Sequence, residues 1–206
     1  MNGSTVLPRR TVVVETNCNQ CHVHLTLHGN RRNDPQYCFL CHNPSDADFS
    51  QRPAGQAAQT INMAVMVHRI HDGVNVVPAG REPYQVAGFG GSRHDFSGVL
   101  YPSMSPAGDA TYLQNCSMCH VSGSEQTLPT GLNAVVDPQG WINPIQPVSS
   151  ACSGCHVSKA ESAHFLTNTS VLGESCAVCH ASGAPFGVDA VQALSFGGLD
   201  GAGDSR

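Results

Sequence analysis

Cys18-Asn19-Gln20-Cys21-His22 is the first of five copies of the pattern C-x-x-C-H, which together contain all 10 cysteines of the chain. On one helical turn, cysteines at i and i+3 and a histidine at i+4 lie on the same face. Two thioether bonds can then hold the vinyl edge of a porphyrin while the imidazole reaches its iron, so the pattern predicts covalent attachment of haem c. The other four copies are Cys38-Phe39-Leu40-Cys41-His42, Cys116-Ser117-Met118-Cys119-His120, Cys152-Ser153-Gly154-Cys155-His156 and Cys176-Ala177-Val178-Cys179-His180.

The repetition is what makes this signal specific. One C-x-x-C pair alone is equally typical of a zinc site, a redox pair or half of a disulfide framework. Histidine accounts for 11 of 206 residues, so its presence after all five pairs by chance has a probability of roughly one in a few million. Zinc sites also pair C-x-x-C units without a histidine after each. The sequence therefore predicts five covalently attached haem c groups.

The composition predicts a single domain whose protein core is small. The 206 residues include 7 Phe, 4 Tyr and 1 Trp, while 21 glycines and 13 prolines interrupt regular structure. Five apolar macrocycles would take the place of aromatic side chains in the interior. We therefore expect a mainly irregular fold with short α-helices around a haem-filled core, and an unfolded chain when haem is absent.

The net charge is −5 at pH 7, and five haems, each with a ferric porphyrin of about +1 and two propionates of −1 each, would lower it to roughly −10. This balance argues against nucleic acid as a partner. Lys159 is the single lysine, and arginine's planar fork suits carboxylates. Arg31, Arg32 and Arg69 are therefore expected either to pair with propionates or to be solvated surface charges.

Two ends flank the predicted domain, which is taken as residues 1–206. Residues 1–16 are expected to form a lead-in strap, because Thr11–Val14 can add a short strand. Residues 190–206 are rich in glycine and are expected to be a flexible tail.

The Gly88–Gly91 run lacks the signature of a phosphate-binding loop and is predicted to be a turn in which the backbone approaches a neighbour closely.

The clearest helical pattern covers residues 57–72 and is predicted to stop at Gly73. His68 and His71 lie three residues apart on one side of it. A histidine on an apolar helix is often a satisfied core group. Two of them beside five haem sites instead indicate ligands, so this helix is expected to clamp two neighbouring haems.

The histidine count matches the ligands that five six-coordinate irons require. The proximal ligands are predicted to be His22, His42, His120, His156 and His180. Six histidines remain, and His24 is the surplus one because it follows His22 too closely to serve the same iron. The predicted distal ligands are His28, His68, His71, His94 and His164, with Met63, Met66, Met104 and Met118 as alternatives.

The motifs between the haem sites resemble those of a known family. Leu25 to Gly29, Cys38 to Pro44, Met66 to His71 and Gly88 to Phe96 follow the order seen in a pentahaem half of the OmcA/MtrC-type outer-surface decahaem cytochromes. The resemblance implies distal ligation at His28, His68, His71, His94 and His164. Family members usually carry two pentahaem domains, which alternate with two β-barrel domains, whereas one pentahaem unit is visible here.

These features predict an electron-transfer protein in preference to an enzyme, because two imidazoles on each iron leave no open position.

No run of 18 apolar residues spans a membrane and no signal peptide is visible. Thioether attachment indicates an extracytoplasmic location, at the cell surface, outside the cell or in the periplasm. Expected partners are other multihaem cytochromes or extracellular acceptors such as metal oxides and soluble shuttles. The alternatives are a subunit of a cytochrome filament and a multihaem reductase with one open haem.

Overall fold

Short helices joined by long irregular segments make up the chain, as its glycine and proline content predicts. The computed structural model describes residues 9–101 and 116–194. Its α-helices are α1 (Glu15–His22), α2 (Pro35–Cys41), α3 (Met63–His71), α4 (Gly73–Val76), α5 (Pro147–Cys152), α6 (Lys159–Thr167), α7 (Ala177–His180) and α8 (Val188–Leu194). Its 3₁₀ helices are η1 (Phe49–Gln51), η2 (Phe89–Gly91) and η4 (Cys116–Met118). The antiparallel strand pairs are β1 (Gln85–Ala87) with β2 (Arg93–Asp95), and β3 (Thr169–Ser170) with β4 (Gly173–Glu174).

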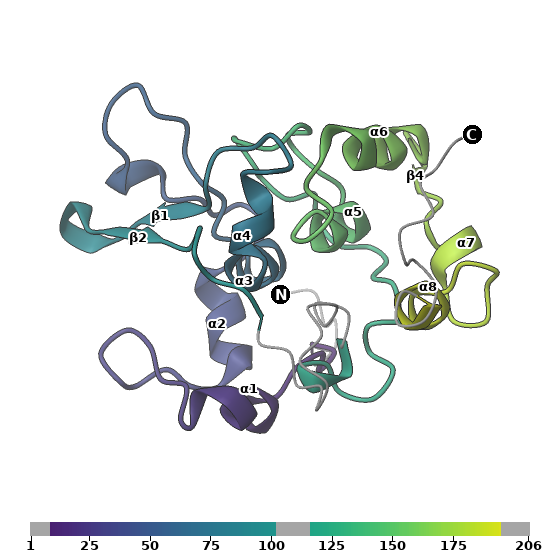
Figure 1. Ribbon diagram of the computed structural model, residues 1–206, viewed down its shortest axis with the longest axis horizontal. Coiled ribbons are helices and arrows are strands. Elements are labelled where there is room, and N and C mark those ends of the chain that lie inside the picture. Colours follow the sequence, from purple (N-terminus) through teal and green to yellow (C-terminus); the bar gives the residue numbers. More distant parts are fainter. Residues whose placement is uncertain (1–8, 102–115, 195–206) are drawn as a thin grey trace, which may run out of the picture.

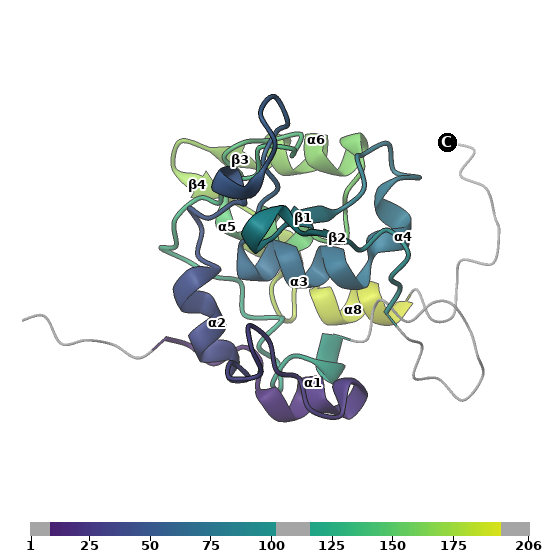
Figure 2. The same ribbon diagram turned by 90° about the vertical axis from the view of Figure 1, so that its left-hand side faces the viewer.

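Helix α3 lies in the middle of the molecule, between α1 and α2 on one side and α5 and α6 on the other (Figures 1 and 2). It begins after Asn62, whose side chain accepts a hydrogen bond from the Val65 amide at 3.3 Å. The start predicted at residue 57 is therefore wrong by six residues. The preceding Ala58 and Thr60 are buried in extended chain, where Thr60 pairs with Ala47 and its carbonyl accepts from the Tyr84 hydroxyl at 2.8 Å.

Gly73 follows the end of α3, as predicted: the helix ends at His71 and Asp72 is its C-cap. The glycine begins the short helix α4, and its Cα faces the carbonyl oxygens of Phe96 and Val99. A side chain at this position would collide with the Phe96 carbonyl, so the glycine permits close packing of two backbone segments.

The hairpin of β1 and β2 contains the predicted close-approach turn. Gly90 and Gly91 adopt φ angles of 70° and 78°, which favour glycine. A Cβ on Gly88 would lie 2.7 Å from the Ser92 hydroxyl and 3.1 Å from Nε2 of His94. The turn therefore confirms the close approach and carries His94 back along β2, opposite Val86.

The apolar core of the described residues is small, as expected. Val65 of α3, Phe165 of α6 and the bridged pair Val135 and Ile145 form one buried cluster. Beside it, Arg69 of α3 donates to both oxygens of Asp137, at 3.2 and 2.7 Å, and both side chains are 1% exposed. Arg69 is thus paired with a protein carboxylate and not, as one reading of the sequence expected, with a propionate.

The lead-in forms a strap across the third motif. Val13 pairs with His120 in an antiparallel bridge, and Val121 donates its amide to the Val12 carbonyl at 2.9 Å. Arg10 reaches the carbonyl of Thr127 at 2.6 Å. At the other end, helix α8 continues to Leu194. Residues 195–206 lie outside the described part, so the tail predicted for residues 190–206 stays a prediction.

Candidate functional site

All five C-x-x-C-H motifs close the same backbone turn. The first lies inside α1, and in the other four the histidine amide donates to the carbonyl of the first cysteine of its motif. These distances are 2.8 Å in the second, fourth and fifth motifs and 2.9 Å in the third. Each turn therefore presents two thiols and an imidazole in the arrangement that the spacing predicts.

Local sequence starts these turns at defined places. Asp34 caps α2 by accepting from the Gln36 amide at 2.8 Å, and Pro35 occupies the first helical position. Pro147 begins α5, whose first amides donate to the carboxylate of Glu174. A cap, a proline or both thus set where the helical turn before the second and fourth motifs begins.

Four of the five proximal histidines face a predicted distal histidine from elsewhere in the chain. Their ring centres are separated by nearly one distance, although the angles between ring planes range from 10° to 80°. The pairs are His22–His71, His68–His120 and His164–His180 at 6.1 Å and His28–His42 at 6.0 Å.

This separation fits one metal ion between two imidazoles. Bonds from a metal to imidazole nitrogen are about 2 Å long, and each nitrogen lies about 1 Å from its ring centre, which together give roughly 6 Å. Direct stacking of two imidazoles would bring the rings closer. The residues present at these four places therefore fit an iron held on both faces by histidine.

Helix α3 supplies two of these four pairs. His71 faces His22 of the first motif, and His68 faces His120 of the third. Loss of solvation, with a contribution from His120, lowers the pKa of His68 to about 4. Its imidazole is therefore neutral at pH 7, and the neutral form is the one that binds a metal.

Gly154, inside the fourth motif, packs directly against the Cβ of His68. Any side chain at this position would overlap His68, so the glycine lets the fourth motif lie next to the histidine that faces the third motif. The Arg69 guanidinium also approaches the Ser153 carbonyl, at 3.4 Å. These contacts fix α3 against the turn that carries Cys152 and Cys155.

The other two pairs use residues close in sequence to a motif. His28 has a left-handed backbone with φ of 51°, in a turn closed by the bridge between Leu27 and Arg32. His164 lies on α6 and faces His180 of the motif that follows α6. The turn and the helix thus each bring a histidine that follows one motif up to the histidine of the next motif.

His156 has no partner ring among the histidines of the described residues. His94 lies on β2 with Nε2 3.3 Å from the Ser92 hydroxyl, and the structure does not bring it to His156. His24 is 64% exposed in its side chain, with Nδ1 3.7 Å from Glu15. Assignment of the fifth distal ligand to His94 thus stays a prediction. Met104, one of the methionine alternatives, lies outside the described residues.

The Nδ1 atoms of several motif histidines have partners that orient the ring. Those of His42 and His180 lie 2.8 Å from the carbonyls of Ile61 and Phe186. Such an acceptor holds the proton on Nδ1 and leaves Nε2 free for the metal.

Glu161 is a residue that sequence reasoning missed. One of its carboxylate oxygens lies 2.8 Å from Nδ1 of His156, and the other accepts from the Ser158 amide at 2.7 Å. Partial burial by itself would raise the pKa of Glu161, but hydrogen bonds from Ser158 and His156 lower it. The pattern Ser158-x-x-Glu161 could have indicated a capping box, though not its contact with a ligand.

The cysteines of different motifs lie close enough to influence one another. Burial is the largest cause of the raised pKa of the thiols of Cys38, Cys119, Cys152 and Cys155, and cysteines of other motifs contribute to the rise. The contributions are those of Cys18 to Cys38, of Cys18 and Cys21 to Cys119, of Cys116 to Cys152 and Cys155, and of Cys176 to Cys152. In space, the motifs therefore follow the order second, first, third, fourth, fifth.

The cysteine pairs are not arranged as zinc sites. Within residues 9–101 and 116–194, no three His, Cys, Asp or Glu side chains converge as ligands of one metal ion. The same part of the chain holds no helix with the length and apolar character needed to cross a bilayer.

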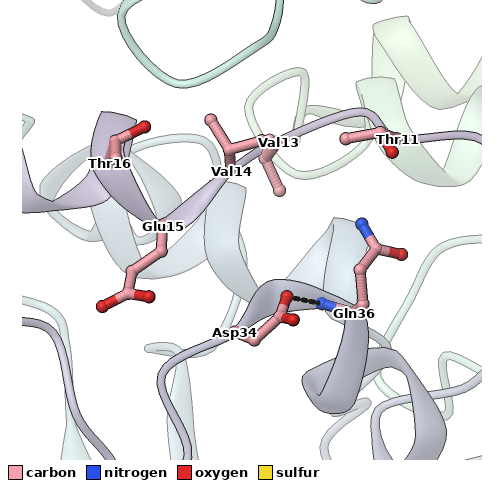
Figure 3. A pocket seen from close by; sticks show the side chains of 7 residues that line it. All are labelled: Thr11, Val13, Val14, Glu15, Thr16, Asp34 and Gln36. Atoms are coloured by element: carbon pink, nitrogen blue, oxygen red, sulfur yellow. Dashed lines mark hydrogen bonds between the residues drawn. The ribbon is translucent and has the colours of Figure 1, made fainter.

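A shallow hollow of about 400 Å³ lies between the lead-in and the start of α2 (Figure 3). Neither cysteine nor histidine lines it, so it is separate from the motif sites. Its lining residues are Thr11, Val13, Val14, Glu15, Thr16, Asp34 and Gln36.

Comparison with known proteins identifies the same family as the motifs. The family model for domains II/IV of MtrC/MtrF-like outer membrane cytochromes matches residues 10–193. Among solved structures, the crystal structure of the outer membrane decahaem cytochrome OmcA is similar in fold, with a TM-score of 0.50 and 24% sequence identity. The match covers 91% of this chain and 24% of that chain, so this chain spans about a quarter of OmcA. Among curated proteins no match is found.

Proposed function

Because the chain belongs to the MtrC/MtrF-like outer membrane cytochromes, with a match to their domains II/IV, we propose that it carries electrons through five haem c groups to acceptors outside the cell. Membership confirms the family, the fold class and the extracytoplasmic location that the sequence predicts. The haem count, the ligands, the acceptors and the partners are part of the proposal.

The observation that carries it is the set of four histidine pairs at 6.0 to 6.1 Å. Haem c supplies a one-electron iron couple when it is bound. The chain's residues tether each porphyrin by two cysteines and hold each iron between two imidazoles. A pair of imidazoles excludes water and small substrates from the iron, which favours electron transfer over substrate conversion.

The neighbouring cysteines support a continuous path. In the third motif, Cys119 lies near cysteines of the first motif and Cys116 lies near cysteines of the fourth. The second motif adjoins the first, and the fifth adjoins the fourth, so these two motifs lie at the ends of the row. The proposed path therefore runs through the motifs in the order second, first, third, fourth, fifth. The partners at its ends would be other multihaem cytochromes, metal oxides or soluble shuttles.

Haem content and reactivity test this function together. Purified holoprotein is expected to have the mass of the chain plus five porphyrins, and a low-spin ferric spectrum that added cyanide does not change. Reduced protein should be reoxidised by ferric citrate or by a soluble quinone shuttle. A mass equal to that of the bare chain, or reduced protein that neither acceptor oxidises, would contradict the proposal.

The fifth distal ligand is proposed to be His94, for which the β1–β2 hairpin has to approach His156. His94→Ala is then expected to convert one of the five centres to a high-spin form that binds cyanide, measured by EPR and optical titration. His24→Ala is the matched control and should leave all centres low-spin. The assignment fails if the effects of the two variants are reversed. Cyanide binding by the unaltered protein would instead indicate an open iron and favour the reductase alternative.

The filament alternative has one feature in its favour. His24 is 64% exposed and is not needed by the ligand count, so it is accessible to a neighbouring copy. If the chain forms such a filament, His24→Ala should reduce large assemblies in electron micrographs. A monomer at every protein concentration would exclude this alternative.

A further inference from the structure

The ring of His156 differs from those of the other motif histidines in what its Nδ1 faces. His42 and His180 face main-chain carbonyls at 2.8 Å, and His120 faces the Ser124 hydroxyl at 3.3 Å. His156 faces a carboxylate oxygen of Glu161 at 2.8 Å. Within the described residues, this is the one motif histidine with a charged acceptor.

The fold fixes the Glu161 carboxylate in this place. Ser158 and Glu161 form a capping box at the start of α6, in which the Ser158 hydroxyl accepts from the Glu161 amide and the carboxylate accepts from the Ser158 amide. Each carboxylate oxygen thus has its own donor, one from the helix cap and one from His156. The contact is held although the two side chains are 50% and 38% exposed.

We infer that Glu161 is a positioning residue that makes the iron held by Cys152, Cys155 and His156 harder to reduce than the irons whose histidines face carbonyls. This inference rests on the proposed haem-binding function. A carboxylate acceptor on Nδ1 increases the basicity of the ligating Nε2. A stronger donor stabilises the ferric state, and such hydrogen bonds are one of the means by which a protein sets a haem potential.

The position of this site gives the inference a functional consequence. The fourth motif lies between the third and the fifth, because Cys152 is near both Cys116 and Cys176, and Cys155 is near Cys116. A lower potential there places an uphill step inside the electron path. An electron on the path would then occupy the third or the fifth site for more of the time than the fourth.

Glu161→Gln tests the inference in the intact holoprotein. The amide has one oxygen in place of two, so it cannot keep both acceptor roles, and it carries no charge. In a spectroelectrochemical titration, one of five components is expected to move to higher potential while the other four stay in place. The EPR g values of one low-spin centre should change in the same variant.

Glu174→Gln is the matched control. Glu174 also caps a helix that leads into the fourth motif, because its carboxylate accepts hydrogen bonds from the amides of Val148 and Ser149. Unlike Glu161, it has no hydrogen bond or ion pair with a histidine of the described residues. It should shift potentials less than Glu161→Gln and leave the g values unchanged. Equal shifts in both variants, five components moving together, or unchanged g values in Glu161→Gln would overturn the inference. Five haems with normal low-spin spectra in these variants would show that only the inference, and not the proposed function, has failed.

Discussion

Replacing His68 with alanine is expected to remove the proposed distal ligand of the haem that Cys116, Cys119 and His120 would hold. His68 and His120 face each other at 6.1 Å with ring planes 10° apart, and His68 lies against Gly154 in packed surroundings. One of five centres should become high-spin in EPR. Because the third site connects the first to the fourth, electron flow between the ends of the chain should fall by about tenfold or more, measured by stopped-flow oxidation.

Added imidazole provides a check on the cause of this loss. The space left by the missing side chain should accept free imidazole, which should restore the low-spin signal and most of the rate. His24→Ala serves as the control, since it removes an exposed histidine without touching an assigned pair. A His68→Ala variant with five low-spin centres and normal rates would contradict the ligand assignment.

The second large effect is expected from Asp137→Ala. Arg69 would keep its charge at 1% exposure without its carboxylate partner. Removing one member of a buried ion pair typically costs about 3 to 5 kcal/mol, because the remaining charge is left uncompensated. Guanidinium denaturation of the holoprotein, followed by circular dichroism, should show a loss of this size.

The double variant Arg69→Met with Asp137→Leu separates the cost of a stranded charge from the value of the pair. Replacing both by apolar residues is expected to recover the stability lost through the stranded charge of Arg69, although Arg81, whose guanidinium lies 3.7 Å from Asp137, still loses its carboxylate partner. Asp95→Ala, on the exposed β2 strand, should cost much less than Asp137→Ala. If the double variant were as unstable as Asp137→Ala, the stranded charge would not be the cause.

The five motif turns could be predicted from the sequence because the spacing of C-x-x-C-H fixes the local backbone, whereas the assignment of distal ligands stays a prediction. The five C-x-x-C-H units specify the local turn by themselves. His68 and His71 could be identified because helical periodicity places both on one face. The structure then supplied the pairing, which depends on contacts between distant segments such as His68 and His120.

What could not be predicted depends on tertiary contacts. Residues 57–60 have a helical pattern, but Thr60 is held in extended chain by Ala47 and Tyr84. Arg69 was expected near a propionate, yet its carboxylate partner is 68 residues away in sequence. The sequence can indicate that Glu161 belongs to a helix cap, but no sequence pattern indicates that its second carboxylate oxygen lies against His156.

Helix α3 carries His68 and His71 on one rigid backbone, which has a consequence for spacing. Three residues advance along a helix axis by roughly 4.5 Å, and this rise is set by peptide geometry and not by packing. Two irons bound by these histidines would therefore be kept at a spacing that the helix sets. A single inserted residue between the two histidines would rotate one of them by about 100° and uncouple both centres at once.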